Sequence, residues 1–233
     1  MKRIVTIMAL VFAAGLAGLA HGASRILEEE LPVEGARTVV LDAAVGDVTV
    51  RGVEGDTIRV TVELRPRKGR LFGSRHGGDG QVARTELEVK RSGAKLRLSL
   101  DWPSGDPLFE ADWTVELPPS LAMNVDLGVG DVLVEGLAGD LDVNSGVGDV
   151  TVHTMGGDVA VDLGVGEVKV TGPLQEYGKV KCSTGVGDCT LKAGSRKLNG
   201  TGMISRDLAW RGEGPSSIHV DTGVGSVTIM LEE

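Results

Sequence analysis

Two cysteines offer the most specific chemistry in the sequence. Cys182 and Cys189 lie on either side of a Gly-Val-Gly motif at residues 185–187. When this motif is aligned with an earlier copy, the cysteines replace Val125 and Val132, which belong to the apolar, inward-facing set. Two inward side chains across one corner can reach the separation that a disulfide requires, and an exported protein meets an oxidising compartment. We therefore expect a Cys182–Cys189 bridge, with two buried thiols as the alternative.

Carboxylates recur at fixed intervals and could form ladders. One set follows the turn glycines and the other precedes the same corner: Asp131, Asp149 and Glu167, and Asp126, Asn144 and Asp162. Stacked carboxylates repel one another, and a divalent cation would relieve that repulsion. Calcium-binding nonapeptide repeats, however, use a Gly-Gly-x-Gly-x-Asp motif that is absent here. Asp and Asn also close turns by bonding their own backbone, so we favour a turn role over a cation ladder and predict no metal site.

A basic segment spans residues 65–84. It contains six Arg or Lys, five Gly and one acid. Such a composition is typical of a flexible, solvated loop. The alternative is contact with an anionic surface, either lipid headgroups or polysaccharide. The residues that would make this contact are Arg65, Arg67, Lys68, Arg70 and Arg75.

No arrangement of residues points to catalysis. The histidines that follow the N-terminal segment, His76, His153 and His219, are far apart in the sequence. Glycoside hydrolysis needs two carboxylates across a cleft, and aromatic residues that could hold sugars make up only 3% of the chain. We expect no enzyme activity and no cofactor.

The elements that position these residues follow from a repeat. Gly-Asp or Gly-Glu recurs every nine residues, and each copy is followed by an apolar-x-apolar triplet such as Val132/Val134 or Val150/Val152. That alternation predicts short strands with one buried face. Copies ending in Gly-Val-Gly alternate with copies of another kind, so the full repeat is eighteen residues, with two strands and two turns.

The spacing of the repeat changes toward the C-terminus. Val165 and Val186 are 21 residues apart, and the next copy, at Val224, follows after 38. An earlier copy occupies residues 42–50, and strand-like alternation flanks the basic segment. We interpret that region as a β-hairpin excursion that covers the N-terminal end of the stack.

The N-terminus has the three parts of a secretory signal peptide. A basic start at Lys2 and Arg3 is followed by an apolar stretch and by small residues up to Ala23. Cleavage would remove those two cations and lower the net charge by 2, from −9 to −11. An acidic protein is poorly suited to bind nucleic acid, because binding requires cations that neutralise the phosphates. We expect a signal peptide at 1–23, one domain at 24–233, no later transmembrane segment, and a periplasmic, secreted or cell-surface location.

The repeat resembles the bacterial putative-adhesin family of envelope domains of unknown function. The resemblance covers roughly residues 30–232. It rests on the segments 116–119 and 125–132, the copy around Gly46-Asp47-Val48, and the C-terminal 210–214 with 218–225. It implies a β-helix in the cell envelope and carries over no catalytic residue.

We therefore expect an all-β fold, a single-stranded right-handed β-helix or β-solenoid with coils of about eighteen residues. The predicted function is a non-enzymatic, adhesin-like binding or structural surface. The candidate partners are an envelope protein, a glycan or a second copy of the chain. The alternative function is a β-helix that binds Ca²⁺ or acts on polysaccharide; an aromatic cluster or a carboxylate pair across a groove would favour it.

Overall fold

The computed structural model describes residues 24–67, 77–103, 105–201 and 206–233. The expected signal peptide lies outside these residues. Within them the fold is all-β, and the helical segments are two short ones, α1 (Gly77–Val82) and η1 (Leu174–Glu176). No helix in this part of the chain is long and apolar enough to cross a membrane.

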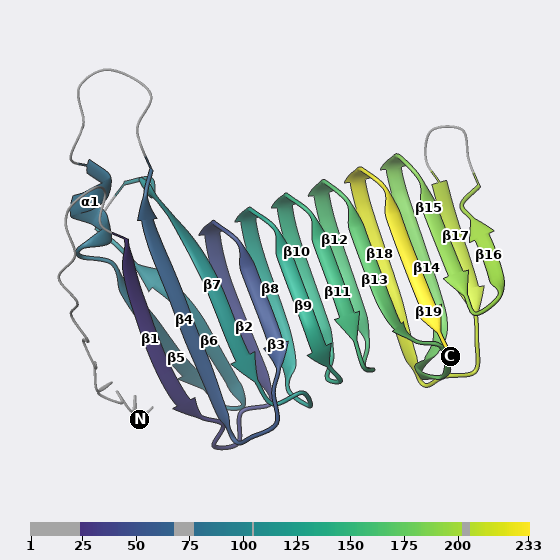
Figure 1. Ribbon diagram of the computed structural model, residues 1–233, viewed down its shortest axis with the longest axis horizontal. Helices are drawn as coiled ribbons and strands as arrows, with labels where there is room; N and C mark the ends of the chain where they lie inside the picture. Colours follow the sequence, from purple (N-terminus) through teal and green to yellow (C-terminus); the bar gives the residue numbers. More distant parts are fainter. Residues whose placement is uncertain (1–23, 68–76, 104, 202–205) are drawn as a thin grey trace.

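The described strands form two sheets that face each other along an elongated stack (Figure 1). The ten-stranded sheet runs in the order β1 (Arg25–Pro32), β4 (Thr57–Pro66), β7 (Phe109–Leu117), β3 (Val48–Gly52), β9 (Val132–Leu137), β11 (Val150–Thr154), β13 (Val168–Pro173), β19 (Val227–Glu232), β15 (Cys189–Ala193), β16 (Arg196–Asn199). The nine-stranded sheet runs β17 (Arg206–Arg211), β14 (Tyr177–Val186), β18 (Ser216–Val224), β12 (Val159–Val165), β10 (Leu141–Val147), β8 (Ala122–Val129), β2 (Thr38–Val45), β6 (Lys95–Asp101), β5 (Glu86–Ser92).

The eighteen-residue period is visible in the strand register. In the nine-stranded sheet Val143 pairs in parallel with Val125 and with Val161. In the other sheet Val150 pairs with Val132 and Val168. Each repeat unit therefore places one strand in each sheet, as in β8–β9, β10–β11 and β12–β13. The predicted triplets lie on the buried face, because valines alternate with polar residues and only one side of each strand can face the opposite sheet.

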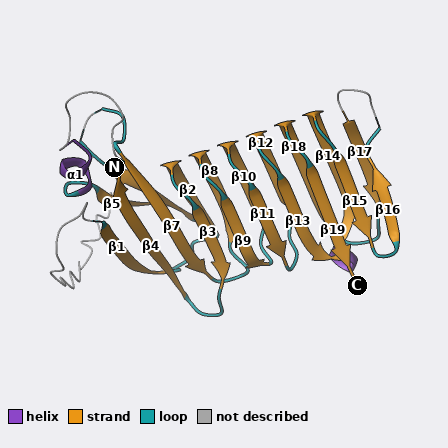
Figure 2. Cartoon of the chain, turned by 45° about the horizontal axis from the view of Figure 1, so that its top comes forward, coloured by secondary structure: helices purple, strands orange, loops and turns teal. Residues whose placement is uncertain are grey.

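The order of the repeat units in space differs from their order in the chain. The C-terminal unit, β18–β19, pairs on one side with β12 and β13 and on the other with β14 and β15. The chain leaves β13, passes through η1, and skips the width of one unit before it starts β14. The lengthened spacing before Val186 supplies residues for this passage. The end of the chain then fills the skipped place (Figures 1 and 2).

The N-terminal end of the stack carries antiparallel strands that flank the basic segment. β2–β3 lies between β8–β9 and the unit formed by β6 and β7. Beyond these strands, β4 and β1 extend one sheet in antiparallel pairing, and the β5–β6 hairpin extends the other. These additions extend both sheets beyond the repeat, and β1 and β5 are then the edge strands at this end.

The interpretation of residues 65–84 as one flexible loop is wrong at both of its described ends. Residues 65 and 66 complete β4, and 77–82 form α1. The helix is held because Val82 is buried, and because the Gln81 side chain donates to the Asp106 carbonyl and accepts from the Leu108 N–H. The Arg25 guanidinium also donates hydrogen bonds to three backbone carbonyls at the end of α1 and just beyond it, those of residues 82, 83 and 85.

Candidate ligand-binding pocket

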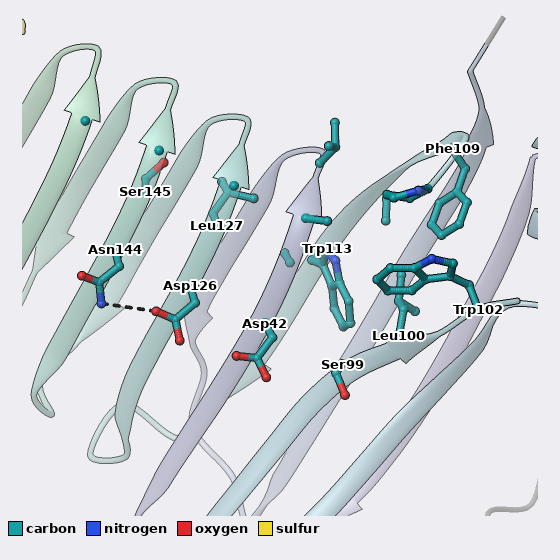
Figure 3. A pocket seen from close by; sticks show the side chains of 18 of the residues that line it. Asp42, Ser99, Leu100, Trp102, Phe109, Trp113, Asp126, Leu127, Asn144 and Ser145 are labelled. Carbon is teal, nitrogen blue, oxygen red and sulfur yellow. Dashed lines mark hydrogen bonds between the residues drawn. The ribbon is translucent and has the colours of Figure 1, made fainter. Parts of the chain in front are cut away.

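A pocket opens where β2 and β6 separate. The two strands pair from Thr38–Lys95 to Leu41–Leu98, and their ladder ends there. β2 continues to Val45 in register with β8, so its edge toward β6 has no strand partner beyond Leu41. The gap gives access to the space between the sheets and forms a pocket of about 680 Å³ (Figure 3). That volume lies in the range of small-molecule sites.

Three aromatic side chains surround the inner part of the pocket. They are Trp102, Phe109 and Trp113. The Trp102 and Phe109 rings meet edge to face with their centroids 6.0 Å apart. Trp113 projects inward from β7 beside β2 (Figure 3) and is only 1% exposed. The remaining inner lining is mostly aliphatic, including Leu100 and Leu127, so the interior favours an apolar occupant.

Two buried polar groups at this pocket have no hydrogen-bonding partner among the described residues. The Nε1–H of Trp113 and the hydroxyl of Ser145 both lack a hydrogen bond among the described residues. Ser145 is 7% exposed, and its neighbours in register on β8 and β12 are Leu127 and Leu163. A buried donor without an acceptor costs about 1–3 kcal/mol. Trp113 and Ser145 are both among the residues that line the pocket.

Carboxylates line the outer side of the pocket. Asp42, Asp126, Asn144 and Asp162 stand in one row across four neighbouring strands, as the spacing of the last three predicted. Arg97 forms an ion pair with Asp42, and the Asn144 amide donates to Asp126 over 3.3 Å (Figure 3). No ion pair to Asp126 or Asp162 occurs within the described residues. The outer side is therefore net negative.

Asp142 lies two residues before Asn144 on the same strand, and the charges of the pocket carboxylates affect its pKa. Its pKa is raised above the ordinary value by burial first, and then by repulsion from Asp162 and Asp126. The carboxylates on this face are therefore close enough to affect each other electrostatically.

The turn carboxylates form a ladder of another kind. The Asp131 Oδ1 accepts a hydrogen bond from the Asp149 backbone N–H over 2.8 Å, and the Asp149 Oδ1 accepts one from the Glu167 N–H over 2.8 Å. Asp47 does the same for Asp131. These side chains therefore bind the backbone of the next repeat unit, rather than their own turn as we had expected. Within the described residues, no group of three or more His, Cys, Asp or Glu is arranged to hold a metal ion.

The cysteine pair lies toward the opposite end of the stack. Cys182 on β14 and Cys189 on β15 form a disulfide with a Cα–Cα distance of 6.2 Å. Both side chains are buried, at 3% and 1% exposure. The bridge thus joins the two sheets across one turn, and neither cysteine lines the pocket.

The basic candidates are divided between two regions. Arg65 forms an ion pair with Asp112, and Arg67 with Glu110, so both cations are partly neutralised by β7. Lys68, Arg70 and Arg75 lie outside the described residues. Of the histidines, His219 contacts Asp221 over 3.0 Å on the outer face, and His153 is on the other sheet.

The aromatic part of the pocket was not predicted from the sequence. A signal was present, since three of the seven aromatic residues fall within the twelve positions from Trp102 to Trp113. In a chain this poor in aromatic side chains, such clustering indicates a local requirement for large rings. The separation of β2 from β6, which makes the pocket, has no counterpart in the repeat pattern.

No family model matches the sequence, and no curated protein does. The structure is similar to a putative cell adhesion protein from Clostridium sporogenes, with 19% identity, a TM-score of 0.58, and coverage of 90% of this chain and 100% of the other. Putative adhesins from Bacteroides fragilis and Parabacteroides distasonis align over 88% and 89% of this chain and 97% and 98% of theirs. Their identities are 15% and 11%, with TM-scores of 0.33 and 0.32. The first match shows that this chain has the fold of a solved protein of the kind that its repeat resembles.

Proposed function

We propose that this chain is a non-enzymatic binding protein of the bacterial cell envelope. The observation that carries the proposal is the pocket between β2 and β6. It combines an aromatic interior, two buried polar groups without partners and a row of carboxylates at its outer side. Recognition of a ligand requires such a combination of apolar volume and a few placed polar groups.

The scaffold that we propose is a right-handed β-solenoid. The eighteen-residue register and the alternation of successive strands between two sheets support this architecture. A stack in which each unit is bonded to both neighbours holds its outer face rigidly. A rigid face lowers the entropic cost of ordering side chains around a ligand.

Three features support a location in the envelope. Residues 1–23 have the pattern of a signal peptide, and the Cys182–Cys189 bridge suits an oxidising compartment. The Clostridium sporogenes protein of the same fold is described as a putative cell adhesion protein. We therefore place the chain in the periplasm or at the cell surface.

A polysaccharide-acting protein is the second candidate, because the aromatic cluster beside carboxylates is a feature that would favour it. Asp126 and Asp162 both lie on the outer face of one sheet, in one row. Hydrolysis instead requires carboxylates on either side of the scissile bond. Incubation with envelope polysaccharide should release no new reducing ends; release that disappears in D126N/D162N would favour the second candidate.

Site-specific crosslinking in the native host tests the binding role. A photoreactive residue at Ala44, exposed at the pocket, is compared with one at Thr151 on the other sheet. We expect the protein in the envelope fraction, with a crosslinked envelope component from position 44 and none from position 151. Retention in the cytosol, or equal crosslinking from both positions, would overturn the proposal.

A further inference from the structure

We infer that the pocket between β2 and β6 binds an amphipathic cation, a molecule with an apolar body and a protonated amine at one end. This inference rests on the proposed binding role and specifies the ligand class for that site.

The interior selects the apolar body. Trp113, Phe109 and Leu127 are each less than 5% exposed, and Trp102 and Leu100 complete the lining. Water in such a space finds few hydrogen-bonding partners, so an apolar group that displaces it gains free energy. A volume of about 680 Å³ has room for a chain of eight carbons or more.

The lining of the space includes two residues whose buried polar groups a guest could satisfy. Register places Ser145 between two leucines, Leu127 and Leu163, in a row that also carries Thr222, whose buried hydroxyl likewise has no partner among the described residues. The serine is buried without a hydrogen-bonding partner among these residues, as is the Trp113 Nε1–H beside the same space. An oxygen of a bound molecule would satisfy either group.

The outer charges select the cation. Of the three carboxylates at the pocket, Asp42 is paired with Arg97. Asp126 accepts only the neutral amide of Asn144, and Asp162 has no salt bridge within the described residues. Two carboxylates therefore remain to attract a protonated amine, and they repel an anionic headgroup.

The test compares three probes of equal chain length, octylamine, octanol and octanoate, on the folded mature chain at pH 7. Binding is measured by calorimetry and by the fluorescence of a W210F variant, in which Trp102 and Trp113 remain. We expect saturable binding of octylamine, roughly five- to tenfold tighter than octanol, with octanoate weakest. Added salt should reduce the preference for the amine.

Two variants assign the result to the pocket. D126N/D162N should reduce octylamine affinity to about that of octanol, whereas E63Q/E135Q, which removes two acids from the other sheet, should leave it unchanged. Ser145→Leu should weaken all three probes while keeping or raising the stability, because it fills the space with the residue that its neighbours carry.

The outcomes separate this inference from the proposed function. Octanoate binding as tightly as octylamine, or an amine preference that survives D126N/D162N, would overturn the cationic ligand. Absence of saturable binding by every probe would overturn the inference as a whole. In either case, crosslinking from position 44 decides the binding role independently.

Discussion

At the scale of single residues, Asp149 accepts a hydrogen bond from the Glu167 backbone N–H, eighteen positions later. Asp→Ala at 149 leaves that N–H without a protein acceptor at an exposed turn, and we expect a loss of about 1 kcal/mol in the free energy of unfolding. Asp→Asn keeps a carbonyl acceptor and should cost less. Urea unfolding of the two variants checks this order; equal losses would show that the acceptor is unimportant.

The Cys182–Cys189 bridge permits a test that separates the covalent link from packing. Reduction should lower the free energy of unfolding by about 2–3 kcal/mol, since the bridge closes a short loop in the unfolded chain. C182V/C189V restores the residue type that other repeat units carry at these positions, and its stability should not respond to reductant. Two free thiols in the unfolded, non-reduced protein would contradict the bridge.

The raised pKa of Asp142 gives a pH dependence with a definite sign. The folded state binds this proton more tightly than the unfolded state, in which the pKa is near the ordinary value of 3.8. Binding of this proton therefore stabilises the folded state. The stabilisation is complete at pH values below 3.8 and is lost as the pH rises through the pKa of Asp142 in the folded state. D142N should therefore be at least as stable as the native protein at pH 7 and lose this advantage near pH 3.8.

Urea unfolding at the two pH values measures the effect. Asp→Asn at 101, an exposed position at the end of β6, serves as the control for removal of one negative charge. The free energy of unfolding of D142N should increase relative to that of this control as the pH rises. A gain that is the same at both pH values would contradict the assignment.

At the scale of elements, the turns hold the repeat units close together. Gly148 has a φ of +140°, and a Cβ at this position would overlap the carbonyl oxygen of Gly130 in the preceding unit. Gly55 has a similar φ, +151°, but no atom lies within 4 Å of its Cβ position. The pair therefore separates backbone strain from the close approach of neighbouring turns.

Gly→Ala at 55 should cost about 1–2 kcal/mol through strain alone. The same change at 148 should cost about 2 kcal/mol more, because the turns must also move apart. Thermal and urea unfolding of the two variants provide the comparison. Equal losses would indicate that the turns tolerate separation.

The strands could be predicted from the sequence because each needs only local information. Val150 and Val152 follow a turn glycine and alternate with polar residues, and this pattern suffices to orient a strand. The cysteine pair could be predicted for the same reason, since both positions align with valines of known orientation. The pocket could not, because it depends on where β6 leaves β2 and on Trp113, which reaches that gap from β7.

At the scale of the whole molecule, the spatial order of the repeat units could not be predicted from the sequence either. Repeat units that differ little in sequence present nearly identical edges, so spacing alone does not determine which unit is adjacent to which. The interval between Val165 and Val186 indicated an irregularity. Only the pairing of β18 with both β12 and β14 shows that the end of the chain fills a gap.

This arrangement makes the last repeat unit the link between two parts of the stack. By strand pairing, β14 and β15 are joined to the other units through β18 and β19, and among the described strands β16 and β17 pair only with β15 and β14. A further link is the hydrogen bond of the Tyr177 hydroxyl, on β14, to Thr154 on β11. A variant that ends at Gly214 lacks residues 215–233 and leaves β12–β13 and β14–β15 without a shared neighbour. In a stack stabilised by contacts between neighbouring units, loss of an internal unit disconnects everything beyond it.

Hydrogen exchange followed by mass spectrometry can detect this disconnection. In the shortened variant, amides of residues 177–211 should exchange at rates close to those of an unfolded chain, while β8 to β11 keep much of their protection. A stack in chain order would instead lose only a terminal cap, and β14 would remain protected by β12. A chain that lacks only Glu233 is the control, and native protection of β14 in the longer truncation would show that the units can stack without the C-terminal one.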